Sequence, residues 1–174
     1  MTKFLTKAAF AATVATGLFA APALAAPAGN SSFKANAKIV KPVTMTKVTD
    51  LDFGTTVMNP SLTSATVTVS DATGSVAVCS SAQLTCAGGF PASFNLTSGV
   101  AGQTVQMSFN APPTKLDHAT IVGASVPFTL DAIEDVLLNS SGAGSFNVGG
   151  QITVVSSTAD GLYSATVNVV ANYL

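Results

Sequence analysis

Apolar and polar residues alternate with a period of two in many short runs along the chain. This is the pattern of β-strands that bury one face and expose the other. Turn-forming pairs such as Asn59-Pro60, Pro112-Pro113 and Asp160-Gly161 separate the runs. The pattern predicts strands over residues 33–39, 43–48, 66–70, 75–79, 93–96, 104–110, 125–130, 151–157 and 163–173.

One stretch departs from this pattern. Residues 131–138 (DAIEDVLL) have the composition of a helix of about two turns, which Asp131 would cap at its N-terminus. Many short strands joined by turns, with one short helix at most, predict an all-β fold. We expect an immunoglobulin-like antiparallel β-sandwich over residues 33–174, preceded by a flexible lead over residues 26–32.

The N-terminal segment has the three parts of an export signal. Lys3 and Lys7 form a positive region, residues 8–21 form an apolar region too short to span a bilayer, and Ala23-Leu24-Ala25 fits the cleavage rule. We predict a signal peptide over residues 1–25 that is cleaved after Ala25. The mature chain then has no membrane span and is exported to the periplasm, the cell surface or the extracellular space.

Export changes the interpretation of the two cysteines. Cys79 and Cys86 are the only cysteines in the chain, and an exported protein meets an oxidising compartment. We therefore predict a structural disulfide between them. A redox-active pair would need a cationic or histidine neighbour to lower a thiol pKa, and the flanking sequence has none.

Charge is sparse, and this excludes several classes of function. The 174 residues include seven lysines, no arginine and eight acidic residues, and only 9% of the chain is charged. Without a dense positive patch, nucleic-acid binding is not expected. One histidine and two cysteines are too few for a four-ligand zinc site.

Few residues suggest catalysis, and none forms a convincing site. His118 follows Asp117 and lies near Lys115, but adjacent residues on a strand point to opposite faces. Asp50 and Asp52 would share one face of a strand end, where a solvated role is expected. We therefore predict no catalytic residues, no metal ligands and no cofactor.

The last predicted strand has the longest regular alternation in the chain. Eleven residues alternate from residue 163 to residue 173, whereas strands are usually five or six residues long. We expect this strand to pair along its whole length and to bury one face, either as a central strand or beside an added one. Together with the preceding glycine, the members of that face are Gly161, Tyr163, Ala165, Val167, Val169, Ala171 and Tyr173.

The spacing of these residues resembles that of a known group of proteins. Gly161 is fourteenth from the end and Tyr173 is penultimate, as in the C-terminal strand of chaperone–usher pilus subunits. The segment LDFGTT at residues 51–56 resembles part of spore-coat-protein-U-like subunits. Residues 37–57, 91–99 and 146–173 together resemble an uncharacterised proteobacterial family of exported β-domains, domain of unknown function 4402.

The pilus resemblance implies a second element, a donor strand near the mature N-terminus. Phe33, Ala35, Ala37 and Ile39 alternate with polar residues and are candidates. The same residues could instead form the first strand of the domain itself, and the sequence leaves both interpretations open.

The expected function follows from these features together. We expect a non-catalytic, exported structural or adhesive surface subunit, similar to a pilus or fimbrial subunit, that assembles by β-strand addition. The resemblance implies a periplasmic chaperone, an usher and like subunits as partners. The alternative is a self-complete secreted β-sandwich that binds a glycan or a protein partner as a monomer.

Overall fold

The computed structural model describes residues 29–174. The predicted signal peptide, residues 1–25, and the first part of the predicted lead lie outside the described residues. Residues 38–174 form one compact unit, which is the folded domain.

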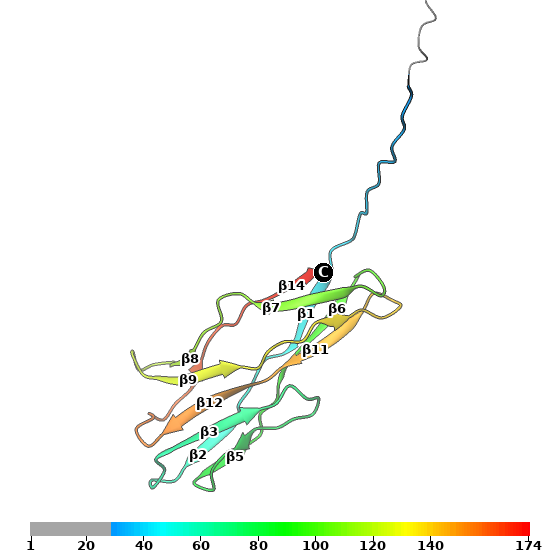
Figure 1. Ribbon diagram of the computed structural model, residues 1–174. Coiled ribbons are helices and arrows are strands. Elements are labelled where there is room, and N and C mark those ends of the chain that lie inside the picture. Colours follow the sequence, from blue (N-terminus) through cyan, green and yellow to red (C-terminus); the bar gives the residue numbers. More distant parts are fainter. Residues whose placement is uncertain (1–28) are drawn as a thin grey trace, which may run out of the picture. The chain divides into compact units, whose positions relative to one another are not determined.

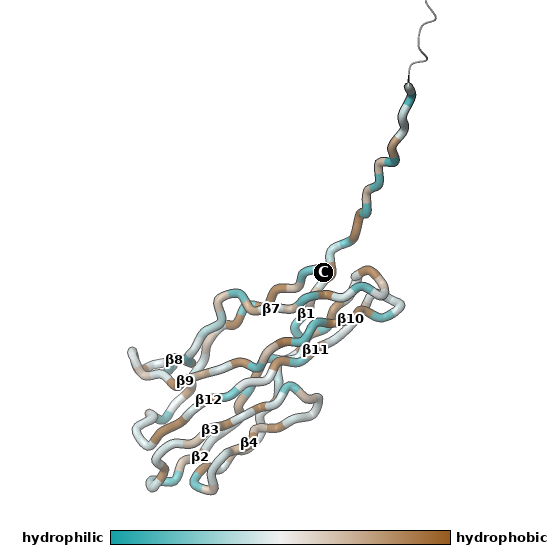
Figure 2. Tube along the Cα trace, viewed as in Figure 1, coloured by the Kyte–Doolittle hydropathy of each residue, from teal (hydrophilic) through white to brown (hydrophobic). Residues whose placement is uncertain are grey.

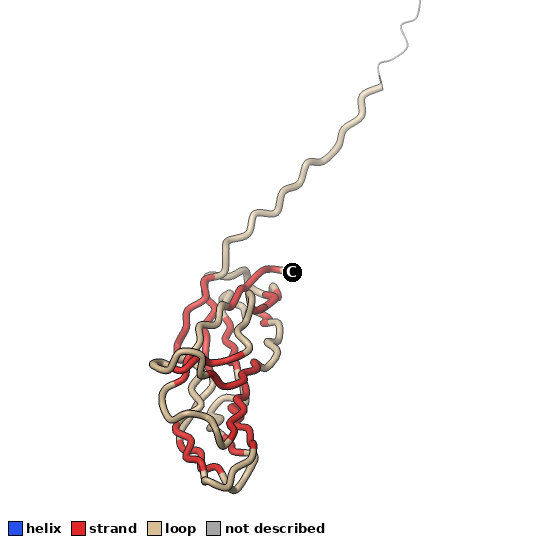
Figure 3. Tube along the Cα trace, turned by 90° about the vertical axis from the view of Figure 1, so that its left-hand side faces the viewer, coloured by secondary structure: helices blue, strands red, loops and turns tan. Residues whose placement is uncertain are grey.

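All regular structure in the described residues is β-strand (Figure 3). The strands pair antiparallel and pack face to face, which confirms the predicted all-β antiparallel sandwich. The strands are β1 (Thr44–Thr49), β2 (Thr55–Met58), β3 (Ser64–Val69), β4 (Val78–Cys79), β5 (Leu84–Ala87), β6 (Ala92–Thr97), β7 (Thr104–Phe109), β8 (Lys115–His118), β9 (Ser125–Leu130), β10 (Val136–Leu137), β11 (Gly144–Val148), β12 (Gly150–Val155), β13 (Tyr163–Ser164) and β14 (Val169–Tyr173).

The first and last segments of the domain each lie at the edge of a sheet. At one end of the domain the strand orders are β1-β6-β11 and β10-β7-β14, and at the other end they are β2-β5 and β13-β8-β9-β12-β3-β4 (Figure 1). The chain from β1 to β2 is therefore an edge in both halves, and so is the chain from β13 to β14.

The opposite side of the sandwich is closed by two connections. The chain leaves β11, which pairs with β6, and enters β12, which pairs with β3 and β9 in the other sheet. Gly149 lies at this switch, where a Cβ atom would collide with the backbone at Val69 and Asp71. The disulfide between Cys79 and Cys86 then joins β4 of one sheet to β5 of the other, with the two Cα atoms 5.8 Å apart. This confirms the predicted disulfide.

Apolar side chains fill the space between the sheets in two clusters. Along the strands these residues alternate with polar ones, as the colours of Figure 2 show. The first cluster is built on Phe53, Leu62, Val67, Val69, Leu84, Val126, Phe128, Ile152 and Val154, and the second on Leu96, Val105, Met107 and Leu138.

The predicted helix over residues 131–138 is wrong. Val136 and Leu137 form β10 instead, paired with Val105 and Thr104 of β7, and Leu138 is buried in the second cluster. The free edge of β7 offers backbone hydrogen bonds that a two-turn helix could not match, since short helices are marginal alone. Asp131 consequently caps no helix.

The C-terminal segment is not the continuous strand that we predicted. Only β13 and β14 are strands, and residues 165–168 between them are not. Ser164 pairs with Asp117 and Val169 with Phe109, so four residues of this segment face seven of the neighbouring one. The extra residues form a bulge at Pro112 and Pro113, which have no N–H to donate to a strand partner.

Residues 33–39 form no strand in the described structure, and the first strand of the domain is β1. The structure therefore does not show these residues as the domain's own first strand. The donor interpretation stays a prediction.

Asp131 lies in an unfavourable place for a charge. Burial raises the pKa of the Asp131 carboxyl above its usual range, and the neighbouring Asp71 carboxylate adds to the rise. A raised pKa in the folded state means that this group's contribution to stability is complete at low pH and is lost as the pH rises through that pKa.

We therefore expect Asp131→Asn to raise the melting temperature at pH 7, with the gain shrinking as the pH falls toward 3. Thermal unfolding followed by circular dichroism at several pH values measures this. Asp117→Asn, at an exposed ion pair with Lys115, is the control and should lower the melting temperature slightly at pH 7. A gain for Asp131→Asn that is equal at all pH values would contradict the explanation.

Replacing both Cys79 and Cys86 by Ser should lower the free energy of unfolding by about 2–3 kcal/mol, because the bond closes a short loop in the unfolded chain. Urea denaturation of oxidised wild type and of the double variant measures the difference. Reduced wild type should match the variant, and equal midpoints for all three forms would show that the bond does not hold the sheets together.

Candidate functional site: a groove between the first and last segments

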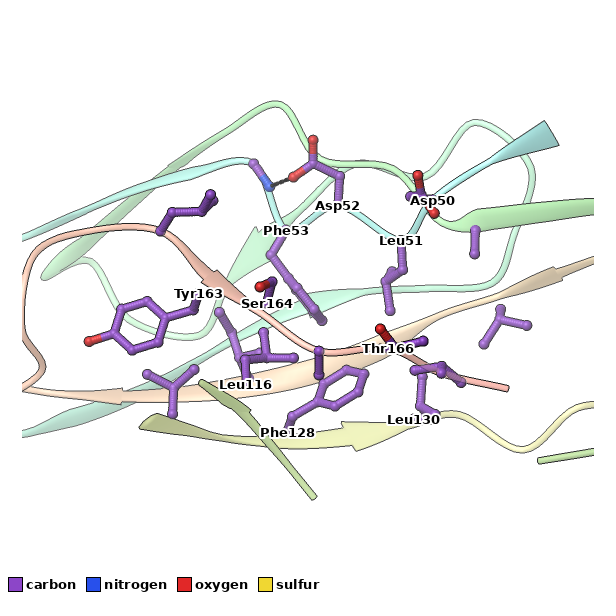
Figure 4. Close-up of a pocket in the computed structure, with 18 of the residues that line it drawn as sticks. Asp50, Leu51, Asp52, Phe53, Leu116, Phe128, Leu130, Tyr163, Ser164 and Thr166 are labelled. Atoms are coloured by element: carbon purple, nitrogen blue, oxygen red, sulfur yellow. Dashed lines mark hydrogen bonds between the residues drawn. The ribbon is translucent and has the colours of Figure 1, made fainter. Parts of the chain in front are cut away.

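A groove of about 1000 Å³ runs between the two edges that face each other across the open side of the sandwich. One rim is the β1–β2 rim, residues 45–58, and the other is the C-terminal rim, residues 158–169. Figure 4 shows residues 50–53 of the first rim opposite Tyr163, Ser164 and Thr166 of the second. No strand pairing joins the two rims in the described structure.

The β1–β2 rim presents unpaired backbone to the groove. Asp52 and Phe90 exchange two backbone hydrogen bonds of 2.9 Å, so the amide groups of Asp52 face β5 and β6. In an antiparallel ladder the neighbouring residues face the other way. The N–H and C=O groups of Leu51 and Phe53 therefore point to the open edge.

The segment LDFG owes its shape to local packing. The Phe53 side chain is buried in the first cluster, while Asp52 accepts a hydrogen bond of 2.7 Å from the Gly54 backbone N–H. Gly54 has a φ of 69°, and a Cβ there would collide with the Ala87 carbonyl oxygen. Only glycine fits, so the motif turns the rim at this position.

The C-terminal rim also presents unpaired backbone to the groove, but for a different reason. Asn168 accepts a backbone hydrogen bond of 2.9 Å from Asn110, and Leu162 accepts one of 2.8 Å from Ala119. Between them, the Pro112–Pro113 bulge draws the neighbouring chain away, and Ala165, Thr166 and Val167 make no backbone hydrogen bond within residues 29–174. By alternation, the amide groups of Ala165 and Val167 point toward the groove.

The floor of the groove is apolar and incompletely covered. Phe128 and Val126 are buried, whereas Leu116 and Leu130 are only partly buried. Figure 4 shows Leu116, Phe128 and Leu130 among the residues that line the groove. Toward β1 the floor continues with Met45, Phe94 and Phe109, all partly buried.

The residues of the predicted C-terminal face lie largely as the alternation indicates. Tyr163 and Val167 pack against the first cluster, and Val169, Ala171 and Tyr173 pack against the second. All five are half-buried rather than fully buried, and Ala165 is exposed. These side chains pack inward but stay half-covered, as expected where no strand lies beside them on the groove side.

Gly161 and Tyr163 hold the end of this rim against His118. The Tyr163 ring meets the His118 ring edge-on at 4.9 Å, and its hydroxyl donates to the Ala159 carbonyl at 2.8 Å. Gly161 has a φ of 145°, and a Cβ there would collide with the His118 imidazole. The glycine and the first tyrosine of the rim are thus required by packing.

His118 is held by its neighbours in a way that suits a structural role. Its Nδ1 accepts backbone hydrogen bonds from Thr120 and Ile121, at 3.1 and 3.0 Å, so its Nε2 carries the proton that is donated to the Asp160 carbonyl at 2.9 Å. Asp117 instead pairs with Lys115 at 2.9 Å. The structure does not join these three residues into one site.

The other two acidic residues singled out in the sequence, Asp50 and Asp52, have different partners. Asp50 pairs with Lys47 at 2.5 Å, and Asp52 caps Gly54. A second, smaller hollow of about 320 Å³ has Asp71, Glu134 and Asp135 among its lining residues. Within residues 29–174, no group of three or more His, Cys, Asp or Glu side chains is arranged to hold a metal ion.

Tyr173 anchors the far end of the C-terminal segment. Its hydroxyl accepts a hydrogen bond of 3.0 Å from the Val100 backbone N–H, and its ring packs in the second cluster. β14 is thereby fixed against β7 on one side only, which leaves its other edge free.

Several residues of the groove were not predicted from the sequence. Leu116 on β8 and Met58 on β2 lie in strands that the alternation did not reveal, because four-residue strands give a weak signal. LDFG marked the β1–β2 rim only as a resemblance.

The comparisons agree with that resemblance. A family model described as a domain of unknown function, DUF4402, matches residues 43–173. The chain belongs to this family. The matched range includes both rims and the whole floor of the groove, so the groove is a feature of the family domain in this chain. Searches of the curated proteins and of the solved structures found no match.

Helices long and apolar enough to cross a membrane are absent from the described part of the chain.

Gly161→Ala should lower the free energy of unfolding by about 2–3 kcal/mol, since it adds backbone strain and a collision with His118. Gly123→Ala is the matched control: its φ is 86° but a Cβ there meets nothing within 4 Å, so only the strain, about 1 kcal/mol, is expected. Chemical denaturation measures both. If packing on His118 matters, His118→Ala should recover part of the Gly161→Ala loss, and equal losses for the two glycines would contradict it.

Proposed function

We propose that this protein is a non-catalytic, exported structural or adhesive subunit of the cell surface, and that it assembles by accepting a β-strand from another chain into the groove. The groove between two unpaired edges is the observation that carries the proposal. An added strand would hydrogen-bond to one or both rims and would place its inward side chains on the apolar floor.

Physical chemistry makes the uncovered groove costly for a free subunit. Unpaired strand edges invite pairing with other chains, and the half-covered side chains leave apolar surface in water. A strand that covers both would contribute backbone hydrogen bonds and apolar burial together. The same reasoning supports a role for a periplasmic chaperone and an usher, which would cover the groove until subunits join.

Export rests on the sequence of residues 1–25 and on the disulfide. The disulfide between Cys79 and Cys86 suits an oxidising compartment, which for an exported bacterial chain is the periplasm or the cell exterior. A self-complete secreted domain that binds its partner as a monomer is the competing function. The behaviour of the groove in solution separates the two.

Val167→Asp should abolish assembly, because it places a carboxylate at the edge of the apolar floor. Val170→Asp is the matched control, since Val170 lies in the same segment but is exposed on its other face. Sedimentation velocity of the mature chain measures assembly, and circular dichroism measures folding. Equal assembly of both variants would show that the groove is not used.

Because Val167→Asp could also disturb folding, a second variant acts on the backbone alone. Ala165 is exposed and its N–H has no partner within the described residues. Ala165→Pro removes that N–H and should block strand addition while the domain stays folded. Ala165→Gly retains the N–H and should assemble normally. A folded wild-type domain that stays monomeric even with co-expressed partners would favour the monomeric function.

A further inference from the structure

We infer that the strand accepted by the groove is residues 33–39 of a second copy of this chain, guided there by opposite charge. This inference rests on the proposed function and names the partner. It depends on how charge and apolar residues are distributed between this segment and the groove.

Charge divides sharply along the described chain. Residues 29–43 contain three lysines and no acidic residue. Residues 44–174 contain two lysines and all eight acidic residues, a net charge of −6. A basic segment and an acidic domain on the same chain attract each other between copies, and such attraction raises the rate of encounter and selects the partner.

The acidic groups lie where the segment would be received. Asp50 and Asp52 line the groove on the β1–β2 rim and Asp160 on the C-terminal rim, whereas Lys47 is the one lysine among the lining residues. Lys47 is already paired with Asp50. The rims therefore carry a net negative charge above an apolar floor.

The segment has the complementary pattern. Phe33, Ala35, Ala37 and Ile39 share one face of an extended strand, and Lys34 and Lys38 share the other. With the apolar face on the floor, the two lysines would point outward over the acidic rims. Seven extended residues span about 23 Å, and Pro42 follows soon after, where a missing N–H interrupts pairing.

The segment is exposed and would break few contacts if it moved into a groove. Every residue from 29 to 42 is exposed, and the side chains of Phe33 and Ile39 are 92% and 94% exposed. The Lys38 ammonium donates to the Gln103 side chain at 3.1 Å, in an exposed contact that is weak in water. Insertion would cover two large apolar side chains as well as the floor of the groove.

The test uses the mature chain, residues 26–174. Sedimentation velocity should show multimers that grow with concentration for wild type. Phe33→Asp combined with Ile39→Asp should give monomers with an unchanged melting temperature, because both side chains are exposed in the free chain. Wild type that is monomeric at every concentration would overturn the inference.

The role of charge is tested separately by two matched double variants. Lys34→Glu with Lys38→Glu should weaken association about tenfold or more. Lys41→Glu with Lys115→Glu changes the net charge equally, outside the segment and the groove, and should weaken it much less. Adding Asp50→Lys and Asp160→Lys to the first pair should restore association. Equal effects of the two lysine pairs, or no restoration, would overturn the guidance by charge.

The two proposals fail differently. If Ala165→Pro blocks assembly but the Phe33 and Ile39 substitutions do not, the groove accepts a strand from elsewhere, and the inference fails while the proposed function stands. If none of these substitutions changes assembly, both fail.

Discussion

The main constraint on this structure is a groove whose two rims have no strand partner. Within the described residues, the β1–β2 rim and the C-terminal rim are sheet edges that line the groove without pairing with each other. Backbone groups and half-buried apolar side chains meet the groove there together. In water, neither set gains the free energy that pairing and burial would bring.

The groove persists because local features hold its rims apart and in shape. Gly54 turns one rim where no side chain fits, Gly161 lets the other pack on His118, and Pro112–Pro113 prevents its neighbour from pairing with residues 165–167. On the opposite side of the sandwich, the disulfide joins β4 of one sheet to β5 of the other and so holds the two sheets together.

In the interaction that we propose, the open groove of one copy would receive the basic, alternating segment of another. Each is unfavourable alone, since one exposes an apolar floor and the other exposes Phe33 and Ile39 to water. Their charges are opposite, so association between copies would be favoured by charge and would cover both apolar surfaces. The net charge of the whole chain is small because the basic segment and the acidic domain partly cancel. A head-to-tail contact of this kind leaves a free groove and a free segment at the two ends of each assembly, so that further copies can add unless the assembly closes into a ring.

Period-two alternation and turn residues determined the all-β class and the position of most strands, because one-sided burial leaves its mark in the order of residues. Alternation also predicted the inward face of the C-terminal segment, whereas the disulfide followed from the presence of two cysteines in a chain with an export signal. Tertiary structure decided the rest. Residues 131–138 became an edge strand because β7 offered hydrogen bonds, and the last strand broke because its neighbour carries two prolines. The groove itself arises from segments more than a hundred residues apart, and no local pattern can show that two edges face each other unpaired.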